Sequence, residues 1–173
     1  MAAPEQMFAH ALNMLKGWHD IHAVDFAAKA AADVEFPIKS GRVAMLDADG
    51  ALVPGLQGNA MALFVHRGAG RYDTENPGGT DWYAVNPDGT LSALVACQGY
   101  ELQSTEFNSA EDYAPNDTLT AGYSLSDEAV GGVLKLGTVY TDPICGVVSR
   151  GVEQNANRVD VLGFWTVWLP PTP

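Results

Sequence analysis

The stretch that decides the fold runs from Val34 to Val53 and reads Val-Glu-Phe-Pro-Ile-Lys-Ser-Gly-Arg-Val-Ala-Met-Leu-Asp-Ala-Asp-Gly-Ala-Leu-Val. Its apolar residues form two short runs separated by Ser40-Gly41. Asp49-Gly50 is followed by a returning apolar run, and an Asp-Gly pair between apolar runs is a strong signal of a β-hairpin. The stretch therefore predicts two short strands and a hairpin.

The same pattern continues to the end of the chain. Pro87-Asp88-Gly89-Thr90 is a second hairpin signal, and turn residues recur about every ten positions, the spacing of a sandwich or barrel. No long helical pattern interrupts the run, so we expect a mainly β body, a small β-barrel or β-sandwich, over residues 35–173. Besides the strands beside the two hairpin signals, including 91–97, further strands are predicted at 60–66, 100–107, 132–136, 138–140, 144–149 and 158–169.

Residues 1–34 differ from the rest. Met7, Phe8, Leu12, Leu15 and Trp18 recur at three- and four-residue steps, which predicts a helix over 7–18 with one apolar stripe. The alanine-rich stretch 25–33 fits either a helix or an extended arm. We therefore expect an N-terminal helical segment or arm over 1–34, which serves attachment rather than the folding of the body.

The last predicted strand is apolar on both faces. Its sequence from Val159 to Leu169 places Trp165 on one face and Phe164 and Trp168 on the other. A strand of this kind is buried on both sides, inside a barrel wall or at a subunit contact. Phe164, Trp165 and Trp168 are therefore predicted to lie in the core or at an oligomer interface.

The charge of the chain excludes several classes of partner. Its 173 residues carry a net charge of −12 and only 9 Lys and Arg. A duplex-binding surface needs clustered cations, and the sequence holds no such cluster, so we expect neither nucleic acid nor a membrane as partner. The first residues lack the basic region of a signal peptide. Cys97 and Cys145 each lie in an apolar run, which favours buried free thiols in a reducing cytosol over a disulfide.

Motifs for chemistry fail on spacing. His19, Asp20 and His22 lack the spacing of a known zinc site, and a polar helix face is favoured. The sequence Asp47-Ala-Asp49-Gly50 has its glycine too early for an EF-hand loop. Gly122-Tyr-Ser-Leu-Ser126 lacks the final glycine of a nucleophile elbow. We therefore expect no catalytic residue, no metal and no cofactor, and a protein that is not an enzyme.

Three groups of segments together carry a resemblance to a known family. The first is Phe36 to Gly55, the second is Gly99 to Phe107 followed by Tyr113 to Ala121, and the third is Gly146 to Gly151 leading to Val161 to Pro171. In pattern and order these segments resemble the head decoration (cement) proteins of tailed bacteriophages. The resemblance covers about residues 36–170.

The resemblance implies a β-rich structural virion protein, usually a homotrimer, made in the host cytoplasm. Such a protein binds the outer surface of the major capsid protein lattice and stabilises the phage head. Decoration proteins use an N-terminal arm on a neighbouring capsid subunit, so the resemblance implies that residues 1–34 contact the partner. The apolar residues of that segment are then candidates for partner binding, namely Met7, Phe8, Leu12, Leu15 and Trp18.

A carbohydrate-binding or adhesin β-module, on a virion or a cell surface, is the alternative function. Trp82, Tyr83 and Tyr72 flank a glycine-rich loop, and aromatic rings exposed on a β-scaffold stack on sugars.

Overall fold

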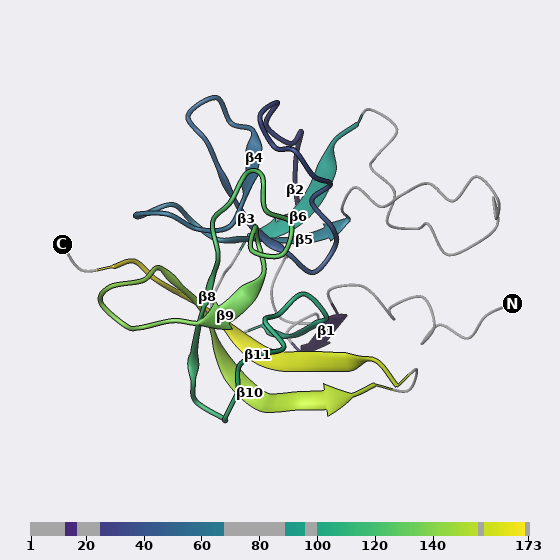
Figure 1. Cartoon of the computed structure of the whole chain (residues 1–173), viewed down its shortest axis with the longest axis vertical. Coiled ribbons are helices and arrows are strands. Elements are labelled where there is room, and N and C mark those ends of the chain that lie inside the picture. The colour runs from purple at the N-terminus through teal and green to yellow at the C-terminus, as the bar shows by residue number, and fades with distance from the viewer. Residues whose placement is uncertain (1–12, 17–24, 68–88, 96–99, 156–157, 172–173) are drawn as a thin grey trace, which may run out of the picture.

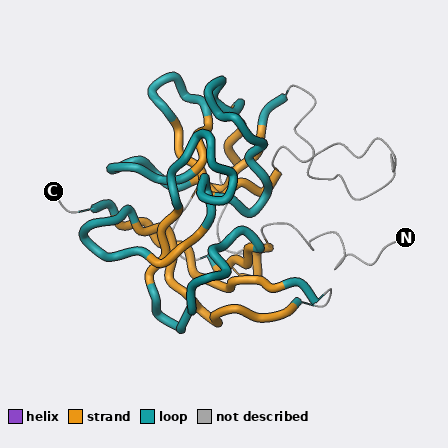
Figure 2. The backbone as a smooth tube through the Cα atoms, viewed as in Figure 1, coloured by secondary structure: helices purple, strands orange, loops and turns teal. Residues whose placement is uncertain are grey.

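The computed structural model describes residues 13–16, 25–67, 89–95, 100–155 and 158–171. All regular secondary structure in these residues is β-strand, and they contain no helix, as Figure 2 shows. The mainly β body predicted from the turn spacing is confirmed.

The strands form two antiparallel sheets, which lie in the upper and lower halves of Figure 1. The upper sheet has the order β2-β6-β5-β3-β4, and the lower sheet has the order β1-β7-β11-β10-β8-β9. The bounds are β1 Asn13–Lys16, β2 Asp25–Ala28, β3 Val43–Leu46, β4 Leu52–Pro54, β5 Leu63–Arg67, β6 Leu91–Val95, β7 Glu101–Ser104, β8 Thr118–Ala121, β9 Leu134–Leu136, β10 Ile144–Gln154 and β11 Asp160–Leu169.

The upper sheet curls until its two ends meet. The chain that follows β2 forms a parallel bridge to β4 through Ala30 and Leu52. The amide of Ala31 donates to the carbonyl of Leu52 at 2.9 Å, and the amide of Leu52 donates to the carbonyl of Lys29 at 2.8 Å. These bonds join the two ends of the curled sheet at one point, and we call the sheet closed in this way a ring.

The lower sheet closes in the same way. The chain that follows β7 forms a parallel bridge to β9 through Phe107 and Leu134. The amide of Leu134 donates to the carbonyl of Glu106 at 3.0 Å, and Asn108 donates to the carbonyl of Leu134 at 2.8 Å. An unpaired sheet edge is a template for aggregation, and each bridge covers part of one.

The two rings have the same topology. Adding five to each strand number in the upper sheet gives β7-β11-β10-β8-β9, which is the order of the lower sheet without β1. We call residues 25–95 unit 1 and residues 101–169 unit 2. The registers also correspond. Equivalent opposed pairs are Ala44–Leu63 with Leu119–Gly146, Val65–Ala93 with Val148–Phe164, and Phe26–Ala93 with Leu102–Phe164.

Two short motifs mark this internal repeat in the sequence. Gly50-Ala-Leu-Val-Pro-Gly55 and Gly132-Val-Leu-Lys-Leu-Gly137 share the pattern Gly-x-Leu-x-x-Gly. Gly50 and Gly132 both have a φ of 78°, a conformation that glycine adopts without steric cost. A second shared motif, Val-x-Arg-Gly, occurs at 65–68 and 148–151, and the register shifts in β5 and β10 both begin at its valine. Neither motif is long enough to reveal the repeat from the sequence alone.

Unit 1 is buried on both faces of its sheet. One face fills its own ring, and the other packs against the interior of unit 2, where the rings of Phe64 and Phe164 lie 5.5 Å apart. Consecutive residues are therefore buried along most of these strands, at Val43–Met45 of β3, at all three residues of β4 and at Leu91–Leu94 of β6, as expected for strands covered on both sides. The ring of unit 1 is filled by Ala28, Ile38, Ala44, Leu52, Leu63, Val65, Leu91 and Ala93.

Several predicted elements are confirmed by their position. The hairpin at Asp49-Gly50 joins β3 to β4, and the predicted strands at 60–66, 91–97, 100–107, 132–136, 144–149 and 158–169 contain or overlap β5, β6, β7, β9, β10 and β11. Two predictions are wrong. Residues 138–140 lie in a turn rather than a strand, and 34–41 contain no strand because Pro37 lacks an amide donor and Gly41 has a φ of 91°.

The structure does not confirm the helix predicted over 7–18. Its described residues, Asn13–Lys16, form strand β1 on the edge of β7, and the rest of the range lies outside the described residues. A short isolated helix is only marginally stable in water, whereas the edge of β7 offers backbone partners. In the alanine-rich stretch the extended alternative holds at Asp25–Ala28, which form β2. A boundary at residue 34 would therefore separate β2 from the ring that it completes.

Two truncations test the role of β2. Deleting residues 1–34 removes β2 and the closing bridge, so we expect the melting temperature to fall by more than about 10 °C or cooperative melting to be lost. Deleting residues 1–24 removes β1 but keeps β2 and the closing bridge, so it is the matched control and should still melt cooperatively. Calorimetry of the three proteins makes the measurement. A 35–173 fragment that melts like the whole chain would show that the body folds without residues 1–34.

Candidate functional site

Most of the predicted partner-binding residues lie outside the described residues. These are Met7, Phe8, Leu12 and Trp18. The fifth, Leu15, lies in strand β1. The aromatic residues of the alternative function, Tyr72, Trp82 and Tyr83, also lie outside them, as do His19, Asp20, His22 and Cys97. Their proposed roles stay predictions.

The aromatic residues of β11 occupy three different environments. Phe164 is fully buried in the central core. Trp168 is partly buried and packs against that core, and Trp165 is half-buried. Only Phe164 is thus enclosed within the chain itself.

The two motifs considered for chemistry that fall within the described residues serve as turns. The carboxylate of Asp47 accepts hydrogen bonds from the amides of Asp49 and Ala51 at 2.9 and 2.8 Å, which fixes the hairpin. The hydroxyl of Ser124 accepts a hydrogen bond from the amide of Asp127 at 3.0 Å. Among the described residues, no group of three or more His, Cys, Asp or Glu is placed to hold a metal ion.

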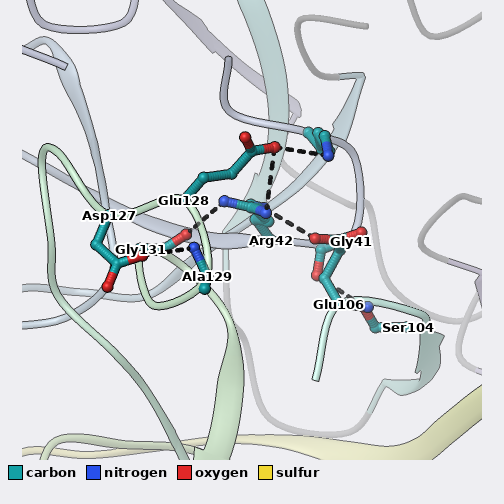
Figure 3. A network of polar contacts seen from close by, with 9 residues as sticks. Gly41, Arg42, Ser104, Glu106, Asp127, Glu128, Ala129 and Gly131 are labelled. Atoms are coloured by element: carbon teal, nitrogen blue, oxygen red, sulfur yellow. Dashed lines mark hydrogen bonds and ion pairs between the residues drawn. The ribbon is translucent and has the colours of Figure 1, made fainter. Parts of the chain in front are cut away.

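The best-defined polar site is the joint between the two units, where Arg42 of unit 1 reaches into unit 2 (Figure 3). The side chain of Arg42 is only 4% exposed. Its Nε donates to Oε2 of Glu106 at 2.9 Å, and one terminal nitrogen donates to the carbonyl of Gly131 at 2.9 Å. The other terminal nitrogen lies 3.9 Å from Oε1 of Glu128, and the guanidinium lies over the ring of Phe36. A buried guanidinium is tolerated only when its donors are met in this way.

Backbone contacts reinforce the joint. The hydroxyl of Ser104 donates to the carbonyl of Gly41 at 2.7 Å and accepts from the amide of Glu106 at 3.0 Å. The amide of Val43 donates to the carbonyl of Gly132 at 2.9 Å. The two units are thus connected by main-chain bonds as well as by Arg42.

A second polar cluster fixes the chain before β8 to β9. The hydroxyl of Tyr113 lies 3.0 Å from the carbonyl of Asn108 and 3.2 Å from the carboxylate of Glu111. That carboxylate also accepts the amide of Leu136 at 2.7 Å. Burial and the nearby charge of Glu111 raise the pKa of the Tyr113 phenol above its usual range, so this tyrosine stays protonated as a donor.

Unit 2 also contains an ion pair between Arg150 and Glu101 and the free thiol of Cys145. Nε of Arg150 donates to Oε1 of the buried Glu101 at 3.0 Å. Cys145 is a free, fully buried thiol, and burial raises its pKa to about 12. Because the thiolate is the reactive form, Cys145 is inert at neutral pH.

None of these groups forms a catalytic arrangement, and sequence reasoning did not identify the joint. The local sequence places Arg42 only beside a strand, because its two hydrogen-bond partners, Glu106 and Gly131, lie 64 and 89 positions further along the chain. The available signal was weaker. Arg42 is the one charged residue in the short apolar run that follows Ser40-Gly41.

Comparison with known proteins places the chain in no family. No protein-family model matches it, and no curated protein matches it. Among the described residues, none belongs to a helix long and apolar enough to cross a membrane.

Replacing Arg42 by methionine tests the joint. The variant leaves Glu106 and the carbonyl of Gly131 without their donor, so we expect a loss of about 3 kcal/mol in the free energy of unfolding. Lys39→Met is the matched control, because Lys39 pairs with Glu128 at 2.6 Å while both side chains are about half exposed. That change should cost less than about 1 kcal/mol. Urea denaturation measures both, and equal losses would contradict a structural role for Arg42.

The thiol of Cys145 gives a pH-dependent prediction. In a Cys97→Ser background, Cys145 should not react with a thiol reagent at pH 8 until denaturant is added. The folded pKa lies above the ordinary value of 9.0, so the unfolded chain loses this proton first as pH rises. The contribution of Cys145 to stability is therefore complete below about pH 9 and is lost between about pH 9 and 12. Adding Cys145→Ala should remove that part of the decline, and rapid labelling of the folded protein would contradict the burial.

Proposed function

We propose that this protein is a structural virion protein that binds the outer surface of the major capsid protein lattice and stabilises the head of a tailed bacteriophage. The observation that carries the proposal is the joint at Arg42, which connects two closed β-rings into one body. A protein that reinforces a shell under pressure needs rigidity and contact area, and no reaction centre.

The segments that carry the family resemblance contain residues of the joint, of the closing bridge of unit 2 and of the two longest strands. The first segment, from Phe36 to Gly55, supplies Arg42, its ring contact and the hairpin of unit 1. The second supplies Phe107, which closes unit 2, and Tyr113. The third supplies β10 and β11, the two longest strands. The segments in which we see the resemblance thus supply residues that hold the body together.

The remaining expectations of the family form part of the proposal. We propose a homotrimer on the outside of the capsid, with residues 1–34 contributing to attachment. Strand β1 supports this in one respect, because it adds to the edge of β7 and so shows that this segment can pair with a sheet edge. The net charge of −12 would keep many copies soluble before assembly.

Purified virions of the phage that encodes this chain test the proposal. Mass spectrometry should detect the chain in a fixed ratio to the major capsid protein. Purified protein should also co-sediment with heads that lack it and raise the temperature at which those heads rupture. Absence from virions, together with no co-sedimentation, would contradict the function.

A further inference from the structure

Two loops at equivalent positions of the two units carry exposed apolar side chains. Residues 55–62 connect β4 to β5 in unit 1, and residues 137–143 connect β9 to β10 in unit 2. Among the described residues, the two most exposed large apolar side chains are Tyr140, 71% exposed, and Met61, 51% exposed. The repeat therefore presents one such side chain from each of these loops.

The two loops begin at opposite ends of the same strand. The amide of Leu56 donates to the carbonyl of Ala121 at 3.4 Å, and the amide of Gly137 donates to the carbonyl of Thr118 at 2.9 Å. Thr118 and Ala121 are the ends of β8, so the bases of the loops lie about 10 Å apart. In Figure 1 both loops project to the left, the side on which the C-terminus lies. One flat partner could contact both.

Tyr140 is held in an unfavourable backbone conformation. Its φ is 78°, and a bulky residue rarely adopts the left-handed region. The turn enforces this conformation, because the amides of Thr141 and Asp142 donate to the carbonyl of Thr138 at 3.2 and 2.9 Å. The carboxylate of Asp142 also accepts the amide of Thr138 at 2.8 Å. Strain of this kind concentrates where a side chain must be displayed for function.

The chemistry of the two loops favours a protein as their partner. In a chain with a net charge of −12, they contain a single charged residue, Asp142, whose carboxylate is used within the turn. The centre of a protein–protein interface is depleted in charged residues and enriched in Tyr and Met. Rigid aromatic side chains that enter a pocket supply much of the binding energy there.

We propose that loops 55–62 and 137–143 form a docking surface, with Met61 and Tyr140 entering two apolar pockets on one subunit of the capsid lattice. This inference rests on the proposed function and assigns a contact to the body in addition to the N-terminal segment. Because the two loops are equivalent and adjacent, they act as a bivalent anchor, and removal of both side chains should weaken binding far more than removal of one.

The test measures binding to heads that lack the protein. Met61→Ser removes one side chain, and Tyr140→Asn removes the other while placing there a residue that tolerates positive φ. We expect each single variant to bind about 10-fold more weakly and the double variant about 100-fold or more. The matched control is the double variant Leu46→Ser and Val152→Ser, which changes two exposed apolar residues elsewhere and should bind like the unchanged protein. Melting curves should show that all variants fold.

The outcomes separate this inference from the proposed function. If the unchanged protein does not bind heads, the proposed function fails and the docking surface fails with it. If the unchanged protein binds and the double variant binds equally well, only the docking surface is overturned. Sedimentation velocity adds a third outcome. Loss of a self-associated species in the double variant would show that the loops bind a second copy of this chain, which also overturns docking to the capsid.

Discussion

The burial of Arg42 is the constraint on which the arrangement of the two units depends. A guanidinium that is 4% exposed must have its donors paired, and its close partners, Glu106 and the carbonyl of Gly131, both belong to unit 2. Unit 1 therefore cannot bury this residue by itself. The joint couples the folding of the two rings, because unit 1 supplies the guanidinium donors and unit 2 supplies their acceptors.

The same topology serves two different packing tasks. In unit 1, Leu63 and Ala93 line a small closed interior, whereas the equivalent residues of unit 2 are Gly146 and Phe164. A Cβ on Gly146 would lie 2.9 Å from the ring of Phe164, so the small residue makes room for the large one. The space left by Gly146 lets Phe164 pack against Phe64, so that one apolar core contains residues of both units. The units are alike in backbone and complementary in side chains.

Closure of both rings shortens the open edges of a β protein built from short strands. Parallel bridges at Ala30–Leu52 and Phe107–Leu134 pair the ends of each sheet. Strand β1 lies outside this scheme, on the edge of β7. Among the described large apolar side chains, Tyr140 and Met61 are the most exposed, and both lie on loops.

The sequence by itself determined what depends on neighbouring residues. The Asp49-Gly50 hairpin and most strands from Val43 onward follow from local alternation and turn chemistry, because each needs only a few adjacent residues. The acidic balance and the lack of clustered cations were equally evident. The apolar spacing around Leu15 predicts a helix that the structure does not confirm, since a helical period says nothing of a strand partner more than eighty positions away.

Only the tertiary structure decided which residues meet. The burial of Arg42, the ring closures and the equivalence of the two units all join segments that are far apart in the chain. The motif Gly-x-Leu-x-x-Gly was present twice, but a six-residue pattern with two glycines also arises by chance. The matching strand registers identify the two copies as equivalent, because hydrogen-bonded pairing fixes which residues oppose each other and local sequence does not.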